Sequence, residues 1–214
     1  MTEPLTVSAA ITSWGGGPAP ADTRRVVVMM HGYGSNEADL ASLAPALPRG
    51  LAWASLRAPL TLAPGSYSWF PLTVPGNPQP EPVLAATEAI SAWIDENIPV
   101  GVGVVSLGFS QGGLMASQLL RAVPRRVEAT VILGGFVLAS PLPGDDALAD
   151  DRPPVFDGRG ASDTVIAADA VARAHDWLPG HSTLTERIYP GLGHGIDATE
   201  LADVVAFLEA LPNP

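Results

Sequence analysis

Short apolar runs alternate with longer amphipathic segments along most of the chain. The runs are rich in β-branched residues, which is typical of strands buried on both faces. Strands that alternate with amphipathic helices form a mainly parallel sheet covered by helices on both sides. The pattern therefore predicts an α/β fold, with strands over 25–30, 51–56, 101–109, 127–135, 153–158 and 183–190.

Two of the amphipathic segments carry an apolar stripe at helical spacing. Apolar residues three and four positions apart lie on one face of a helix, and that face packs against the core. We therefore expect core-facing helices over 81–98 and near the end of the sequence. The stripes consist of Val83, Ala86, Ile90, Trp93 and Ile94 in the first, and Leu201, Val204, Val205, Leu208 and Leu211 in the second.

Residues 59–82 interrupt this alternation, because they hold seven prolines together with Gly65 and Gly76. Proline lacks the amide that helix interiors and central strands need, so this segment is expected to be a long loop. Long loops are commonly either functional or disordered. The aromatic residues of YSWF at 67–70 favour a functional loop, since disordered segments are poor in aromatics.

Composition indicates a folded chain with a substantial core, because 47% of the residues are hydrophobic and 15% are charged. No internal repeat and no change in composition marks a boundary, so we expect one domain over 1–214. The formal net charge is -11, and the basic residues form no cluster larger than a pair. Nucleic acid and anionic membrane surfaces are therefore not expected as partners.

The chain has no cysteine, and all 11 of its basic residues are arginine. This composition excludes disulfides, a cysteine nucleophile, lysine Schiff bases and the lysine-dependent phosphate loop. The first residues show no basic segment ahead of an apolar run, and the longest apolar stretches are about nine residues, too short to span a bilayer. We expect a cytoplasmic protein without integral membrane association.

The stretch GFSQG at 108–112 matches G-x-S-x-G between a predicted strand and a predicted helix. In that context the motif forms a sharp turn that exposes a nucleophilic serine, here Ser110, and the glycines avoid collisions with neighbouring backbone. A tight turn with an idle serine would carry the same local pattern. Further residues are therefore needed to support a nucleophile.

A serine nucleophile needs a histidine base, which follows it in the chain in this kind of fold. His194 lies in the glycine-rich stretch PGLGHGI after the last predicted strand, where its ring can reach Ser110. His175 falls inside a predicted helix and His181 in a polar turn, so both are expected to be surface residues. His194 is the predicted base.

The carboxylate that orients the base should follow the preceding strand, where Asp157 and Asp163 are available. Asp163 lies in the loop past the strand and is the predicted third member, although it could also serve only as a helix cap. Asp157 is expected to end the strand. The four histidines are scattered along the sequence, so no metal site and no cofactor are expected.

An oxyanion hole would use two backbone amides, one after the nucleophile and one in a loop after an early strand. These are predicted to be the amides of Gln111 and Tyr33. Since only its backbone would be used, Gln111→Ala is expected to keep most activity. His31 is expected to hold the loop by local hydrogen bonds.

Together these residues resemble the small carboxylesterases of the α/β-hydrolase superfamily, a group that includes acyl-protein thioesterases and lysophospholipases. The resemblance runs in order through HGYGSNEADL, RAP, SWF, GFSQGG, LGGF, FDGRGASDTVI and PGLGHGI, from residue 31 to 196. It implies an α/β-hydrolase fold with a mostly parallel sheet, helices on both faces and no large cap domain. It also implies Ser110, Asp163 and His194 as a catalytic triad.

The chain departs from the family pattern at Arg159, where histidine is usual, at Pro71, and in the proline-rich insert that follows. These departures leave the substrate open. The leading hypothesis is a serine esterase that cleaves uncharged esters of short to medium acyl chains, with Trp69 and Phe70 in the acyl-site wall and the loop 59–82 near the active site. The alternatives are a lysophospholipase, an acyl-protein thioesterase or, more distantly, a silent binding module. The expected partner is a small-molecule ester, and a homodimer is left open.

Overall fold

The computed structural model describes residues 4–72 and 76–212. Its main sheet has seven strands in the order β1-β3-β2-β6-β7-β8-β9. β1 pairs with β3 in the antiparallel sense, and the remaining neighbours pair in parallel. The strands are β1 (Ala10–Thr12), β2 (Arg25–Met30), β3 (Ala52–Leu56), β6 (Gly103–Phe109), β7 (Val127–Leu133), β8 (Pro154–Gly160) and β9 (Thr183–Tyr189).

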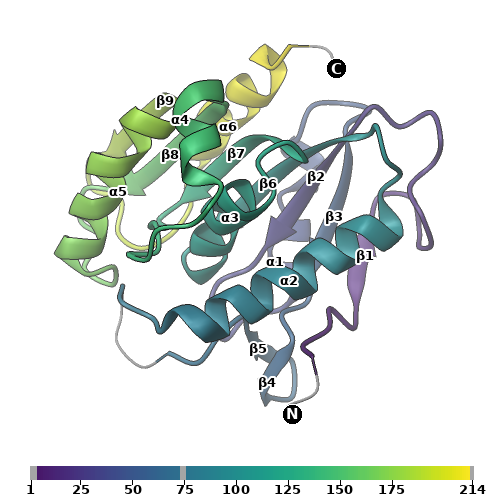
Figure 1. Cartoon of the computed structure of the whole chain (residues 1–214), viewed down its shortest axis with the longest axis horizontal. Helices are drawn as coiled ribbons and strands as arrows, with labels where there is room; N and C mark the ends of the chain where they lie inside the picture. The colour runs from purple at the N-terminus through teal and green to yellow at the C-terminus, as the bar shows by residue number, and fades with distance from the viewer. Residues whose placement is uncertain (1–3, 73–75, 213–214) are drawn as a thin grey trace.

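Helices cover both faces of this sheet (Figure 1). One face carries α2 (Pro80–Asn97), α3 (Gln111–Ala122), α4 (Asp145–Asp151) and α5 (Ala168–His181). The other face carries α1 (Glu37–Ala41) and α6 (Ala198–Ala210), and a short 3-10 helix spans Ala44–Ala46. The predicted architecture, a mostly parallel sheet with helices on both faces and no large cap domain, is confirmed for the described part of the chain.

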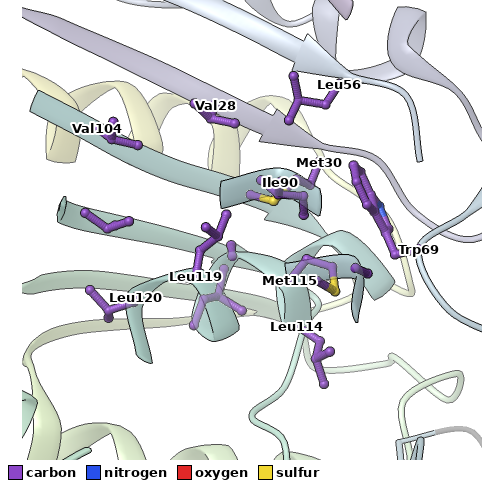
Figure 2. Close-up of a cluster of buried hydrophobic side chains, with 14 of the residues drawn as sticks. Val28, Met30, Leu56, Trp69, Ile90, Val104, Leu114, Met115, Leu119 and Leu120 are labelled. Carbon is purple, nitrogen blue, oxygen red and sulfur yellow. The ribbon is translucent and has the colours of Figure 1, made fainter. Parts of the chain in front are cut away.

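Successive residues of the central strands point to opposite faces and feed two apolar clusters. Val28 and Met30 of β2 pack towards α2 and α3, whereas Val27 and Met29 pack towards α1 and α6. Figure 2 shows the first cluster, in which Val28 and Met30 face the leucines and Met115 of α3. Both faces of the strand are thus buried, as expected for a parallel sheet between helix layers.

The six predicted strands are present, with ends shifted by a few residues. β1 was not predicted, because a three-residue edge strand has too little periodicity to stand out. The helices predicted over 81–98 and near the end of the sequence correspond to α2 and α6. Across the described residues, no helix is both long enough and apolar enough to cross a membrane.

The prediction of a continuous loop over 59–82 was wrong at both ends. Its first part forms a hairpin of β4 (Leu60–Ala63) and β5 (Ser66–Ser68), which turns at Gly65 with a φ of 76°. Its last part begins α2 at Pro80, where proline is tolerated because first-turn amides have no partner within the helix. Residues 73–75 of the predicted loop lie outside the described residues.

The order of the strands reverses the direction of the chain at the carboxyl ends of β2 and β6. After β2 the chain moves outward to β3, whereas β6 lies on the other side of β2 and leads on to β7. The loops that follow β2 and β6 therefore run in opposite directions. Ligands bind at this kind of reversal in open α/β sheets, so the fold directs attention to the loops after these two strands.

Candidate active site

Ser110 occupies the turn between β6 and α3 in a backbone conformation that is rare for a residue with a side chain. Its φ is 56° and its ψ is -116°. Its amide donates to the carbonyl of Leu133 at 2.8 Å, and its own carbonyl accepts from the amide of Gly113 at 2.9 Å. Backbone in sparsely populated regions costs about 1–3 kcal/mol and concentrates at functional sites.

Two glycines make this turn sterically feasible. A Cβ at Gly108 would collide with the carbonyl oxygen of Gly112, and a Cβ at Gly112 would collide with the carbonyl oxygen of Met30. The strand, the turn and the helix therefore approach each other at backbone distance. The glycines that stood out in the sequence have a direct steric reason.

His194 lies between Ser110 and Asp163. Its Nε2 is 2.8 Å from the Ser110 Oγ, and its Nδ1 is 2.7 Å from the Asp163 Oδ2. The side chains of His194 and Asp163 are 16% and 8% exposed. The ring of Phe109 packs against the imidazole with centroids 4.9 Å apart. Three predicted site residues thus form one hydrogen-bonded line.

Two loops side by side bring the carboxylate to the imidazole. The amide of Ser162, after β8, donates to the carbonyl of Leu192, after β9, at 2.9 Å. The second oxygen of Asp163, Oδ1, accepts from the amide of Val165 at 2.8 Å. This bond orients the carboxylate so that Oδ2 faces His194. Asp163 is therefore held by its own loop as well as by the histidine.

The other aspartate and histidines considered as acid or base in the sequence lie away from Ser110. Asp157 is inside β8, 5% exposed, and burial raises the pKa of its carboxyl to about 7. His175 contacts Glu186 at 3.0 Å on the surface. His181, expected in a polar surface turn, is instead the half-buried last residue of α5 and stacks on a tryptophan of that helix. Asp157, expected to end the strand, instead lies in its interior.

Tyr33 and Gln111, whose backbone amides were predicted to form the oxyanion hole, both border the same cavity beside Ser110. Among the described residues, neither amide donates a hydrogen bond. Next to Tyr33, the amide of Gly34 donates to the carbonyl of Tyr67 at 2.8 Å. The two free N–H groups are therefore available to an oxygen atom bound near Ser110.

His31 is fully buried and supports the loop that carries Tyr33. Its Nε2 accepts from the amide of Ala58 at 3.2 Å, so the proton lies on Nδ1, which donates to the carbonyl of Gly32 at 2.7 Å. Burial lowers the pKa of the His31 imidazole, which keeps the ring neutral. This arrangement matches the local role expected for His31.

A mainly apolar cavity of about 260 Å³ opens beside Ser110. Phe70 borders it, as predicted, but Trp69 does not: the indole is fully buried in the core cluster shown in Figure 2. The sequence did not identify the remaining apolar wall, because its members come from separate segments of the chain and nothing in their local pattern shows that they face one cavity. That wall consists of Leu72, Pro78, Phe109, Phe136, Val165 and Ile166.

The end of the proline-rich segment is fastened to α5. Arg173 donates to the carbonyl of Gly76 at 2.7 Å, and the side chain of Asn77 donates to Asp169 at 2.7 Å. Arg159, a departure from the family pattern, lies half-buried in β8 and does not border the cavity. Over residues 4–72 and 76–212, no group of three or more His, Asp or Glu side chains is arranged as metal ligands would be.

Comparison with known proteins gives relatives and folds that agree with this geometry. The chain is similar to acyl-protein thioesterase 1 of Kluyveromyces lactis, at 26% identity over 86% of this chain and 91% of the relative. Its fold is similar to a carboxylesterase from Bacillus cereus, with a TM-score of 0.77, 19% identity and 94% of each chain covered. A carboxylesterase from Mesorhizobium loti gives a TM-score of 0.76 at 22% identity, covering 89% of this chain and 90% of the other.

The family model described as phospholipase/carboxylesterase matches residues 19–211. That span includes the turn at Ser110, both loops that carry Asp163 and His194, and the cavity beside them. The chain therefore belongs to the phospholipase/carboxylesterase family of α/β-hydrolases.

Proposed function

We propose that the protein is a serine esterase that cleaves carboxylic esters through an acyl-enzyme, with Ser110, His194 and Asp163 as its catalytic triad. Membership of the phospholipase/carboxylesterase family makes the chain an ester hydrolase. The observation that supports the triad is a pair of hydrogen bonds: the imidazole of His194 contacts the Ser110 Oγ at 2.8 Å and Asp163 at 2.7 Å.

In the acylation step, the Ser110 Oγ attacks the ester carbonyl carbon while its proton moves to the Nε2 of His194. Asp163 stabilises the imidazolium and keeps the ring oriented. The carbonyl oxygen becomes negative and accepts from the amides of Tyr33 and Gln111, which have no other acceptor among the described residues. When the tetrahedral intermediate collapses, the carbon–oxygen bond to the alcohol breaks, and Nε2 returns its proton to the leaving oxygen.

Deacylation repeats these steps with water in place of the serine. His194 takes a proton from the water as it attacks the acyl carbon, and the same two amides stabilise the second oxyanion. Collapse of this intermediate breaks the bond to Ser110, whose Oγ takes the proton back from Nε2. The carboxylic acid then leaves, and the free enzyme is restored.

The cavity favours uncharged acyl groups of short to medium length. Its volume of about 260 Å³ falls just below the usual range for ligand pockets, about 300–1,000 Å³. Among the described residues, no arginine borders it, so a phosphate or carboxylate on the acyl group would lack an arginine counterion. The net charge of -11 further disfavours anionic substrates at low salt.

Thioester hydrolysis is the second candidate, because the acyl-protein thioesterase relative matches most of this chain and the same triad can cleave both bonds. A lysophospholipase would require the site to accept a phosphate-bearing leaving group. A silent binding module has least support, since it would need no aligned serine, histidine and carboxylate.

The decisive experiment is labelling with a fluorophosphonate probe, followed by assays on p-nitrophenyl esters and matched thioesters of graded length. We expect Ser110 to be labelled, Ser110→Ala to resist the probe, and activity to be unaffected by metal chelators. Labelling of Ser110→Ala, or full activity in that variant, would contradict the proposed nucleophile. The ratio of ester to thioester turnover then separates the two candidates.

A cytoplasmic location and a homodimer remain predictions. Cell fractionation tests the first, and light scattering of the purified protein tests the second.

A further inference from the structure

The side-chain amide of Gln111 makes two hydrogen bonds to the backbone of the aromatic segment at 67–70. Its Oε1 accepts from the amide of Trp69 at 2.9 Å, and its Nε2 donates to the carbonyl of Phe70 at 2.8 Å. Gln111 is 4% exposed. Because unpaired buried polar groups are costly, replacing this side chain leaves an amide and a carbonyl of the segment unsatisfied.

The same segment is bonded to the loop that carries Tyr33. The indole Nε1 of Trp69 donates to the carbonyl of His31 at 2.8 Å, and the carbonyl of Tyr67 accepts from the amide of Gly34 at 2.8 Å. These bonds flank Tyr33 on both sides. The buried Trp69, at one end of the cluster in Figure 2, therefore belongs to a connection between two loops.

We propose that the Gln111 side chain is a positioning group that sets the spacing of the two oxyanion donors. One donor is the amide of Gln111 itself, and the other is the amide of Tyr33, which the segment at 67–70 holds from the opposite side. The proposal rests on the proposed esterase function. It revises the expectation that only the backbone of Gln111 is used, and it gives Trp69 a role in this connection in place of the expected cavity wall.

The spacing matters because the two donors come from different elements. The Tyr33 amide is in the loop after β2, whereas the Gln111 amide begins α3. Donors stabilise an oxyanion only at about 2.7–3.1 Å, and a misplacement of about 1 Å costs about 100-fold in rate. A bridge from one donor residue to the segment that holds the other fixes their separation before substrate arrives.

The test replaces Gln111 by methionine, which has similar length but cannot form these two bonds. Gln118→Met is the matched control, because Gln118 is fully buried in the same helix and does not border the cavity. We expect Gln111→Met to lower kcat by about 10- to 100-fold, by the same factor for acetate, butyrate and hexanoate esters, with little change in KM. The control should keep wild-type kinetics.

A trifluoromethyl ketone separates positioning from a general structural effect. Its adduct with Ser110 carries an oxyanion in the hole, so its inhibition constant should rise by the factor by which kcat/KM falls. Gln111→Glu provides the second variant. A protonated carboxyl can replace both amide bonds, whereas the ionised form cannot donate to the Phe70 carbonyl. The activity of Gln111→Glu relative to wild type should therefore increase as the pH is lowered.

Three results would overturn the proposal: wild-type kcat in Gln111→Met, a loss equal to that of Gln118→Met, or a loss that depends on acyl length. A pH-independent activity ratio for Gln111→Glu would also contradict it. Failure of the esterase function is distinguishable, because wild-type protein would then resist the fluorophosphonate probe and hydrolyse no ester in the panel.

Discussion

At the scale of single residues, the backbone of Ser110 links stability to the proposed chemistry. A φ of 56° with a ψ of -116° suits glycine better than any residue with a Cβ. We expect Ser110→Gly and Ser110→Ala to lower kcat alike, by about 10⁴-fold or more. Only the glycine variant should relieve the backbone strain of the turn. Its free energy of unfolding should exceed that of Ser110→Ala by about 1 kcal/mol.

Urea denaturation of the two variants measures that difference. A glycine variant less stable than Ser110→Ala would contradict the expected relief, because strain would then be smaller than the entropy that glycine adds to the unfolded chain. His194→Ala should match Ser110→Ala in activity, and the double variant should be hardly worse than either single one, because members of a triad act as a unit.

The two aspartates that the sequence offered as the acid, one inside β8 and one in the loop after it, differ in what they contact. Asp163 meets the imidazole at 2.7 Å, whereas Asp157 is buried within the strand. Asp163→Asn should lower kcat by about 10³- to 10⁴-fold, because the amide favours the wrong imidazole tautomer. Asp157→Asn serves as the control and should cost far less. A larger loss in Asp157→Asn would mean that the acid is assigned to the wrong position.

At the scale of elements, the two neighbouring aromatic residues that follow β5 have different surroundings and different proposed roles. Phe70 borders the cavity, whereas Trp69 is bonded to the loop after β2. Phe70→Leu enlarges the cavity and should shift the preference towards longer acyl chains. The ratio of kcat/KM for a longer ester to that for the next shorter one should rise by about tenfold. Phe156→Leu is the control, because Phe156 is equally buried but packs on the other face of the sheet.

Rates on a series of p-nitrophenyl esters give the comparison directly. A changed length profile in Phe70→Leu alone supports the cavity as the acyl site. The same uniform loss in both variants would leave Phe70 with a packing role only.

At the scale of the whole molecule, buried carboxyl groups make stability depend on pH. Burial raises the pKa of both Asp157 and Glu200 to about 7, compared with about 3.9 and 4.3 in an unfolded chain. Between these values the folded protein binds more protons than the unfolded one. The contribution of these groups to the free energy of unfolding therefore falls as the pH rises from about 4 to 7.

Glu200→Gln should reduce the fall in the free energy of unfolding as the pH rises. Both oxygens of Glu200 are buried without a hydrogen-bond partner among the described residues, so the charged form is costly. The variant should be more stable than wild type above about pH 7 and lose that advantage near pH 4. His31 acts in the opposite sense: burial lowers its pKa, so its contribution falls as the pH drops below about 6.5. Comparing variant with wild type at each pH removes this common effect.

Thermal unfolding across that pH range is the measurement, with Glu209→Gln as the control. Glu209 is exposed on the same helix, α6. If the stabilities of wild type and Glu200→Gln changed with pH in parallel, the buried Glu200 carboxyl would not be the cause of the pH dependence.

Local sequence by itself determined six strands of the main sheet, the long helices and the turn around Ser110. Each of these depends on residues close together in the chain: apolar periodicity for the elements, and glycines at 108 and 112 for the turn. The order of serine, acid and histidine also came from position alone. These features were predictable because their causes act over a few residues.

Tertiary structure alone decided which distant residues meet. The burial of Trp69 and the bonds from Gln111 to the segment at 67–70 depend on the order of strands in the sheet. An aromatic residue has the same hydrophobicity in a core as in a cavity wall, so sequence could not separate Trp69 from Phe70. Their neighbours come from parts of the chain far away in sequence, and only packing brings those parts together.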